Sequence, residues 1–426
     1  MSIRILSVSL LTVFCLPVLA QKPKQELKRN LQLSGSELVA YLGPREKLSP
    51  APDGMQPFYL SHYGRSGSCY LPDTADCAFV SATLGRAREQ DKLSMLGEEV
   101  LERIEMLSDE VGGKYGELTI VGGEQQRDIA RRMMESFPQV FSDDAVVSAR
   151  STPCPPCMLS MQYALLQMVS QNPMLRPDMA ASRTDIPYLV PQRHRPDDSL
   201  ATAAARRAYA LFCEQNQCWQ RVAGQLFSDV TYPYTEADGP RLAESLFRLA
   251  SSLQNTELRK RMTFYDLFTD DEVLCFWRRQ NAQWFLDFGQ TSLNGGEAPL
   301  AASELLLHII SDADSCLKHP HPGASLRFGN AASLLPLVCL MGLNGYDKSI
   351  DDLGQLERKG WVDYRVLPMS ANIQIVFYRK EEGEGDVLLK VLLNEDEATL
   401  PFEPAQGPYY RWEDFRSYYL TKLRTT

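Results

Sequence analysis

Strand-type segments stand at both ends of this chain, and a long helical stretch separates them. From about 156 to 300 the apolar residues recur at helical spacing, and strand signals are nearly absent. Runs rich in β-branched and aromatic residues lie outside that stretch, at 58–61, 146–149, 325–328, 374–378 and 387–392. This order predicts an α/β core interrupted by an α-helical cap. We place the first part of the core at 21–155, the cap at 156–300 and the second part of the core at 301–426.

The first twenty residues have the pattern of a secretory signal peptide. Arg4 supplies a positive charge, Ile5–Ala20 is almost wholly apolar, and Val18-Leu19-Ala20 offers small residues for cleavage. A membrane anchor is the alternative, but the apolar run is shorter than the roughly 20 residues that a span needs. No later stretch is apolar enough to cross a bilayer. We therefore expect 1–20 to be removed near Ala20 and the protein to be periplasmic or extracellular.

Charge and cysteine content narrow the possible partners and cross-links. The formal net charge of −10 argues against nucleic acid as a partner. The chain has ten cysteines, and removing Cys15 with the signal peptide leaves nine, so at least one has no partner within the chain. Cys69 with Cys77, and Cys213 with Cys218, are close enough in sequence for local bridges. The full connectivity stays open, and a bridge from Cys69 to Cys154 is a further alternative.

A glycine-containing loop follows the first strand, within residues 57–70. Read around Arg65-Ser66-Gly67-Ser68-Cys69, it resembles the Arg-His-Gly-x-Arg signature of the histidine acid phosphatases. The resemblance puts the family's phosphate-binding arginines at Arg65 and Cys69 and its histidine nucleophile at Ser66. Only Arg65 and Gly67 keep the family's residue.

Further motifs follow in the family's order. Gly116–Gln125 is similar to its Gly-x-Leu-Thr-x-x-Gly-x-x-Gln element. Arg150-Ser151-Thr152 opens a segment in which a second phosphate arginine falls on Pro156. Leu326–Ala332 matches the segment that holds a His-Asp or His-Ala-Glu, with Asn330 in place of the histidine and alanine at 331 or 332 in place of the acid. Ser370–Tyr378 also looks like the multiple inositol polyphosphate phosphatase (phytase-like) branch.

The resemblance implies a Rossmann-like, mostly parallel sheet core with an inserted α-helical cap, and a degenerate active site. The implied catalytic positions are Ser66, Asn330 and Ala331, and the implied phosphate-ligand positions are Arg65, Cys69 and Pro156. Loss of a general acid typically costs about 10²–10⁴-fold in rate. Loss of a nucleophile costs on the order of 10⁶-fold. We therefore expect a non-catalytic or ligand-binding homologue without cofactor or metal, which binds a phosphorylated small molecule such as an inositol phosphate only weakly.

Two other functions stay open as alternatives. The first is an active phosphomonoesterase with a non-standard nucleophile, for example His62, which precedes Arg65 by three residues in a shifted register. The second is a carbohydrate- or surface-partner-binding module. Cys154-Pro155-Pro156-Cys157 is a Cys-x-x-Cys motif, but such redox motifs open a helix in a βαβ unit. We predict no such unit here and expect a disulfide or packing role.

Overall fold

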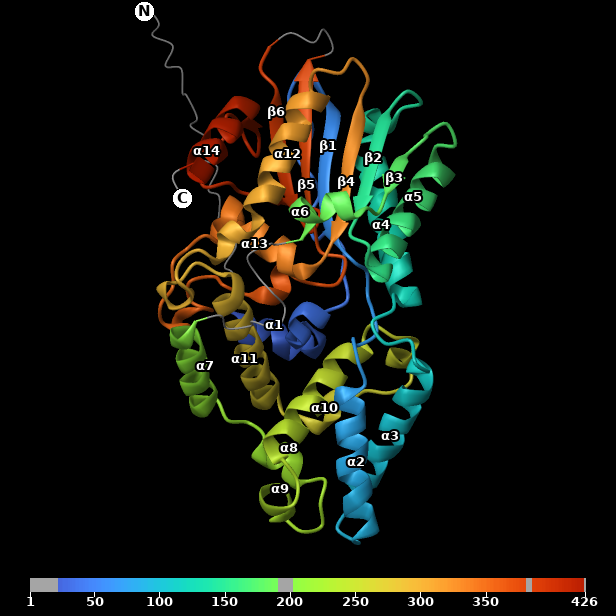
Figure 1. Ribbon diagram of the computed structural model, residues 1–426, viewed down its shortest axis with the longest axis vertical. Coiled ribbons are helices and arrows are strands. Elements are labelled where there is room, and N and C mark those ends of the chain that lie inside the picture. The colour runs from blue at the N-terminus through green and yellow to red at the C-terminus, as the bar shows by residue number, and fades with distance from the viewer. Residues whose placement is uncertain (1–21, 191–201, 381–384, 425–426) are drawn as a thin grey trace, which may run out of the picture.

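The computed structural model describes residues 22–190, 202–380 and 385–424, so the predicted signal peptide at 1–20 lies outside the described residues. An eight-stranded sheet forms the upper half of the molecule in Figure 1. The strands are β1 (Met55–Arg65), β2 (Val146–Ser151), β3 (Asp178–Ala180), β4 (Gly323–Gly329), β5 (Asn372–Lys380), β6 (Leu388–Leu393), β7 (Asp396–Ala398) and β8 (Tyr410–Arg411).

The sheet order is β3-β2-β4-β1-β5-β6-β7, with β8 paired to β6. Strands β3, β2, β4 and β1 are parallel neighbours, whereas β5 runs antiparallel to β1. Strand β6 runs antiparallel to β5, and β7 and β8 run antiparallel to β6. Most strands therefore point in one direction, and the predicted α/β fold with a mostly parallel sheet is confirmed.

The described residues form fourteen α-helices, with shorter 3₁₀ turns between some of them. The helices are α1 (Pro23–Arg29), α2 (Ala75–Glu89), α3 (Met95–Val111), α4 (Ile120–Ser136), α5 (Pro155–Gln171), α6 (Ile186–Leu189), α7 (Ala203–Gln215), α8 (Gln220–Gly224), α9 (Tyr232–Thr235), α10 (Gly239–Leu253), α11 (Asp270–Phe288), α12 (Ser303–Cys316), α13 (Ala331–Met341) and α14 (Trp412–Arg424). A 3₁₀ stretch, Leu31–Leu38, follows α1 in the N-terminal arm.

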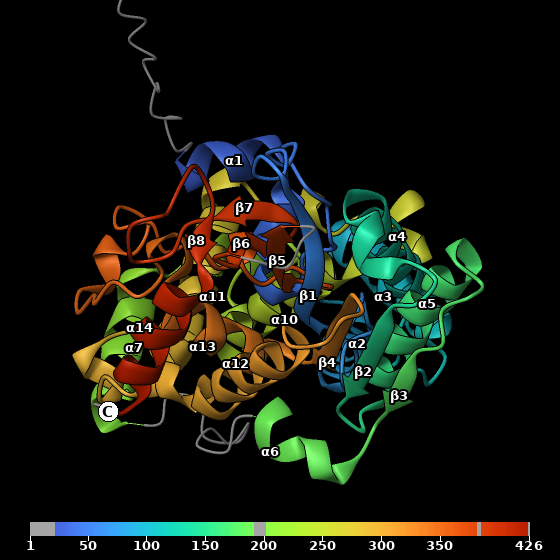
Figure 2. The same ribbon diagram turned by 90° about the horizontal axis from the view of Figure 1, so that it is seen from above.

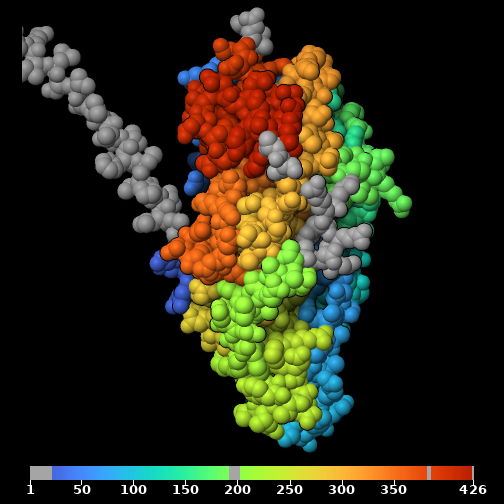
Figure 3. Space-filling view, turned by 60° about the vertical axis from the view of Figure 1, so that its left-hand side comes forward, coloured from blue at the N-terminus to red at the C-terminus, as the bar shows by residue number. Residues whose placement is uncertain are grey.

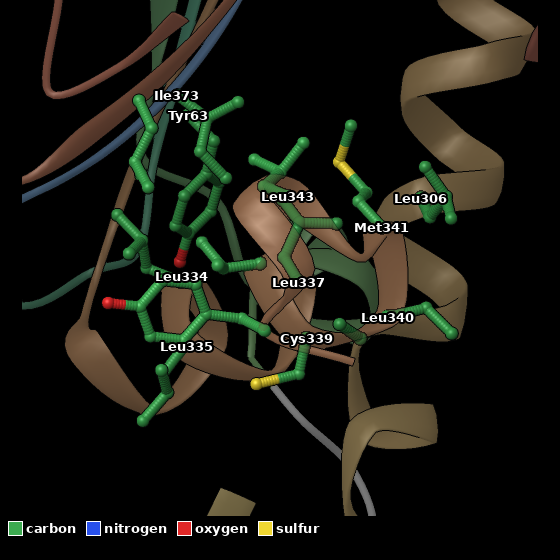
Figure 4. Close-up of a cluster of buried hydrophobic side chains, with 14 of the residues drawn as sticks. Tyr63, Leu306, Leu334, Leu335, Leu337, Cys339, Leu340, Met341, Leu343 and Ile373 are labelled. Atoms are coloured by element: carbon green, nitrogen blue, oxygen red, sulfur yellow. The ribbon is translucent and has the colours of Figure 1, made fainter. Parts of the chain in front are cut away.

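Successive residues of the central strands point to opposite faces of the sheet, and each face has its own core. Tyr59, Tyr63 and Ile373 face α12, α13 and α14. Of the leucines labelled in Figure 4, α13 contributes Leu334, Leu335, Leu337 and Leu340. Leu60 and Phe328 face α4 and α5 on the other side. Figure 2 shows the two groups of helices on opposite sides of the sheet. The central strands β1, β4, β5 and β6 are therefore buried along most of their length, polar residues included.

A third apolar core holds the helical cap together. It joins α2 and α3 to α8, α10 and the first turns of α11. These elements gather at the lower end of the molecule in Figure 1, and the blue and yellow-green segments share that end in Figure 3. The cap thus draws on 75–111 as well as on residues after 202.

The cap boundary differs from the one that we placed at 156. Helix α5 packs on α4, and β3 pairs with β2, so both belong to the sheet layers. Helical periodicity shows that a segment buries one face, but it does not show which core that face enters.

One disulfide lies in the described residues, and it joins Cys218 to Cys275. The local bridges considered from sequence are wrong, because Cys69, Cys77 and Cys213 all carry free thiols. Cys275 lies on α11, 57 residues after Cys218 in the sequence, and only the packing of the cap brings the two cysteines together. Among the described helices, none combines the length and apolar character needed to cross a bilayer.

Candidate functional site

Three neighbouring strands end at the same edge of the sheet, on the side of the cap. Arg65 pairs with Gly329 at the last position of the β1–β4 ladder. Beyond it, the Ser66 amide donates to the Gly329 carbonyl at 3.2 Å, and the Thr152 amide donates to the Phe328 carbonyl at 3.0 Å. The segments that begin at 66, 152 and 330 therefore start side by side, where ligands of open α/β sheets bind.

The loop after β1 rests directly on the first turn of α4. Thr119 caps that helix and donates both its amide and its hydroxyl to the Ser68 carbonyl, at 2.9 and 3.0 Å. The backbones of Gly67 and Gly122 come so close that a Cβ on Gly67 would lie 2.4 Å from the Gly122 carbonyl oxygen. Only glycine fits such an approach. The two glycines that the sequence comparison singled out thus meet in space.

The position predicted for the nucleophile carries a hydroxyl without a base. Within the described residues, the only side-chain hydrogen-bond partner of Ser66 is the Cys69 thiol, at 3.8 Å. That thiol also donates to the Gly67 carbonyl at 3.1 Å. Burial raises the pKa of Cys69 to about 11, so it stays protonated at neutral pH. Neither side chain supplies the charge that a phosphate site needs.

Pro156, Asn330 and Ala331 reach the same edge from two helix N-termini. The Pro156 carbonyl, in the first turn of α5, accepts from the Ser160 hydroxyl at 2.7 Å, and that hydroxyl accepts from the Gly67 amide at 3.0 Å. Asn330 is exposed and caps α13, with its Oδ1 accepting from the Ser333 amide at 3.1 Å. Ala331 is the buried first residue of that helix. The structure therefore brings all these predicted positions together.

The Arg65 side chain is committed to the protein backbone. Its Nη1 donates to the Glu37 carbonyl at 2.9 Å and to the Leu367 carbonyl at 2.8 Å, and its Nη2 contacts the Met369 sulfur at 3.3 Å. Burial lowers the pKa of Arg65. Its Nε is buried without a hydrogen-bond partner in the described residues. Arg65 thus ties the N-terminal arm to the core, and its role as a phosphate ligand stays a prediction.

A network of amides and hydroxyls supports the loop from behind. Gln125 accepts from the Ser68 amide at 3.0 Å, and Gln126 donates to the Arg65 carbonyl at 3.2 Å. Asn255, just beyond α10, accepts from the Ser68 hydroxyl at 2.6 Å. Of these, sequence comparison pointed only to Gln125. Asn255 has no local pattern that marks it, because its partner is 187 residues away.

His62 does not reach this edge. It lies inside β1, paired with Leu326 and Gln374 on the neighbouring strands, and it packs on the Phe328 ring. Burial, reinforced by the positive charge of Arg327, lowers the pKa of His62 to about 3, so the ring is neutral. The shifted register that would make His62 a nucleophile has no support from this position.

Neither a metal-binding cluster of the described residues nor the cavity behind α4 adds a group to the site. The described part of the chain contains no cluster of three or more His, Cys, Asp or Glu side chains that could hold a metal ion. A cavity of about 620 Å³ lies between the arm at 44–51, the end of α4 and strand β5. It opens behind α4, away from Ser66 and Asn330, so its size says nothing about chemistry at the strand ends.

No model of a known protein family matches this sequence, and no curated protein does. Solved structures do match. The multiple inositol polyphosphate phosphatase of Bifidobacterium longum in complex with phosphate superposes with a TM-score of 0.79 at 17% identity, over 92% of this chain and 98% of that one. The same enzyme with inositol hexasulfate gives 0.75 at 17%, over 90% and 97%. The phytase from D. castellii gives 0.67 at 11%, over 96% and 89%.

The fold is that of the histidine acid phosphatases. Nearly the whole length of both chains is matched, so the sheet and the cap are shared. At such low identity the likeness establishes the histidine acid phosphatase fold alone.

Proposed function

We propose that this protein is a non-catalytic homologue of the histidine acid phosphatases that binds a phosphorylated small molecule without turning it over. The observation that carries the proposal is the state of Ser66. It occupies the position that the resemblance assigns to the nucleophile, and among the described residues its hydroxyl has a side-chain hydrogen bond with the Cys69 thiol alone. A serine attacks phosphorus only when a base or a metal ion activates it, and the described neighbours of Ser66 supply neither.

The remaining positions support the same conclusion. The Asn330 side chain is used as a helix cap, and Ala331 has no polar group with which to protonate a leaving alcohol. Pro156 and Cys69 lack the guanidinium forks that neutralise phosphoryl oxygens, each worth roughly 2–5 kcal/mol when buried. The inositol phosphatase and phytases that share the fold motivate the choice of a phosphorylated ligand. Weak binding is expected, and the exported location proposed from 1–20 stays a prediction.

Phosphate release tests the proposal directly. We expect the purified chain to release no more phosphate from phytate or p-nitrophenyl phosphate than its Ser66→Ala variant, between pH 4 and pH 7.5. Turnover that disappears in Ser66→Ala would refute the proposal. Turnover that disappears in His62→Ala would instead favour an active esterase in the shifted register.

A restored variant provides the positive control. It carries Ser66→His, Cys69→Arg, Pro156→Arg, Asn330→His and Ala331→Asp together. We expect this variant to gain detectable phosphatase activity, because the five positions already share one sheet edge. A folded variant without activity would contradict the assignment of these positions.

A further inference from the structure

The Cys154-Pro155-Pro156-Cys157 motif lies in the setting that the sequence did not predict. It opens α5, which follows β2 and leads to β3, and β3 pairs in parallel with β2. The motif therefore sits at the strand-to-helix turn of a βαβ unit. We set redox chemistry aside because the sequence predicts no βαβ unit here, and that prediction is wrong. The unit escapes sequence analysis because β3 is only three residues long and gives no signal of its own.

The two cysteines differ in access to solvent. Cys154 is the N-cap residue and is exposed, whereas Cys157, three residues later, is buried beneath it. The Cys157 sulfur lies 3.0 Å from the Gly329 carbonyl oxygen, which is an alternative acceptor for its single proton. An outer sulfur that a substrate can reach can attack a disulfide, and a second sulfur behind it in the same helical turn can resolve the mixed disulfide that forms.

The helix terminus stabilises a thiolate on the outer cysteine. Pro155 and Pro156 have no N–H, so the first amide available to Cys154 is that of Cys157. The first turn contains no acidic residue. Hydrogen bonds from the Cys157 thiol first, and from its amide, lower the pKa of Cys154 to about 6 against partial burial. The same bond and burial raise the pKa of Cys157 well above its usual value, so the pair carries one charge at neutral pH.

A third thiol lies next to this pair. Cys69, in the loop after β1, is close enough for the charge of Cys154 to raise its pKa, and Cys69 in turn acts on Cys157. Arg65 interacts electrostatically with Cys69 and Cys157, and its charge lowers the pKa of Cys69. Three free thiols from two loops thus meet at one edge of the sheet.

We propose that Cys154 and Cys157 form a redox-active dithiol that exchanges with a disulfide substrate, an activity independent of any phosphate chemistry. The Cys154 thiolate attacks one sulfur of the substrate, forms a mixed disulfide and expels the first thiolate, which takes up a proton. Cys157 then loses its proton and attacks the Cys154 sulfur, which releases the second thiol. The protein dithiol is oxidised to a disulfide, the substrate disulfide is reduced to two thiols, and two electrons and two protons are transferred.

Trapping with glutathione disulfide tests the assignment of the two sulfurs. By intact mass, the reduced wild-type chain should lose two hydrogens without keeping an adduct. Cys157→Ser should retain one glutathione on Cys154, and Cys154→Ser should do neither. Cys316→Ser, which removes a free half-buried thiol on α12, should behave as the wild type does.

Two results of that experiment would overturn the proposal. The first is that the Cys154→Ser variant still loses two hydrogens as fast as the wild type does. The second is a Cys69–Cys154 disulfide as the main product of the wild-type chain, because the inner partner would then be Cys69.

The pH dependence of alkylation tests the thiolate separately. At pH 6 about half of Cys154 is thiolate, against about a thousandth of an ordinary thiol whose pKa is near 9. The lower nucleophilicity of the less basic sulfur offsets roughly 20-fold of that difference. Iodoacetamide should therefore modify Cys154 about 20-fold faster at pH 6 than it modifies N-acetylcysteine, and Cys157→Ala should remove most of this excess. Equal rates for Cys154 and N-acetylcysteine would refute the proposal.

Discussion

The buried carboxyl of Asp363 should make the stability of this protein depend on pH. Asp363 is fully buried and accepts hydrogen bonds from Trp277 Nε1 at 2.8 Å and from the Ser36 hydroxyl at 2.5 Å. Ser36 has a left-handed backbone with a φ of 55°. The carbonyl of the next residue, Glu37, accepts a hydrogen bond from Arg65 Nη1. The carboxyl thus holds the arm segment that engages the candidate site.

The magnitude follows from the pKa of this group. Burial raises the pKa of Asp363 from an ordinary value near 3.8 to about 6, and the charge of Glu37 adds to the effect. The folded protein therefore binds this proton more tightly than the unfolded chain does. The resulting stabilisation is full below about pH 4 and is lost as the pH rises through 6. Two pKa units correspond to about 3 kcal/mol.

An Asp363→Asn variant isolates this contribution. Asparagine is neutral at every pH and keeps an oxygen for Trp277. The free energy of unfolding of the wild type, relative to Asp363→Asn, should fall by about 2–2.5 kcal/mol between pH 4 and pH 7, because part of the total is already lost at pH 4. Urea denaturation followed by tryptophan fluorescence measures it, with the exposed Asp53→Asn as a control for the loss of one charge. A difference that stays constant over this range would refute the reasoning.

Two further predictions concern the site and the cap. Arg65→Ala should lower the free energy of unfolding by about 3–6 kcal/mol, because two charged hydrogen bonds to buried carbonyls are lost. The same variant should leave phytate binding weak in calorimetry, and a sub-micromolar affinity that Arg65→Ala abolishes would show a working phosphate site. Cys218→Ser should cost about 4 kcal/mol, since the disulfide closes a loop with a sequence separation of 57. Cys213→Ser is its matched control in denaturant unfolding, and equal losses in the two variants would contradict a structural role for the bridge.

Much of the fold could be predicted because its signals are local. The runs predicted as strands at 58–61, 146–149, 325–328, 374–378 and 387–392 correspond to β1, β2, β4, β5 and β6. The ends of α3 also follow from short-range chemistry: Ser94 caps its first turn, and Gly112 ends the helix with a φ of 52°. The sequence also allowed us to predict that Ser66 and Asn330 lie close together, because each residue directly follows a strand. The carboxyl ends of neighbouring parallel strands meet at one edge of a sheet.

The sequence by itself determined five of the strands, β1, β2, β4, β5 and β6, and the loops that follow the central strands. Only the tertiary structure decided that α2 and α3 join the cap, that Cys218 pairs with Cys275, and that β3 completes the βαβ unit around Cys154. It also turned Arg65 toward Glu37 and Leu367. Apolar periodicity and helix-capping residues indicate only the local conformation of a segment a few residues long. The partner of a buried face, a sulfur or a guanidinium is set by packing between segments far apart in the chain, which no local pattern encodes.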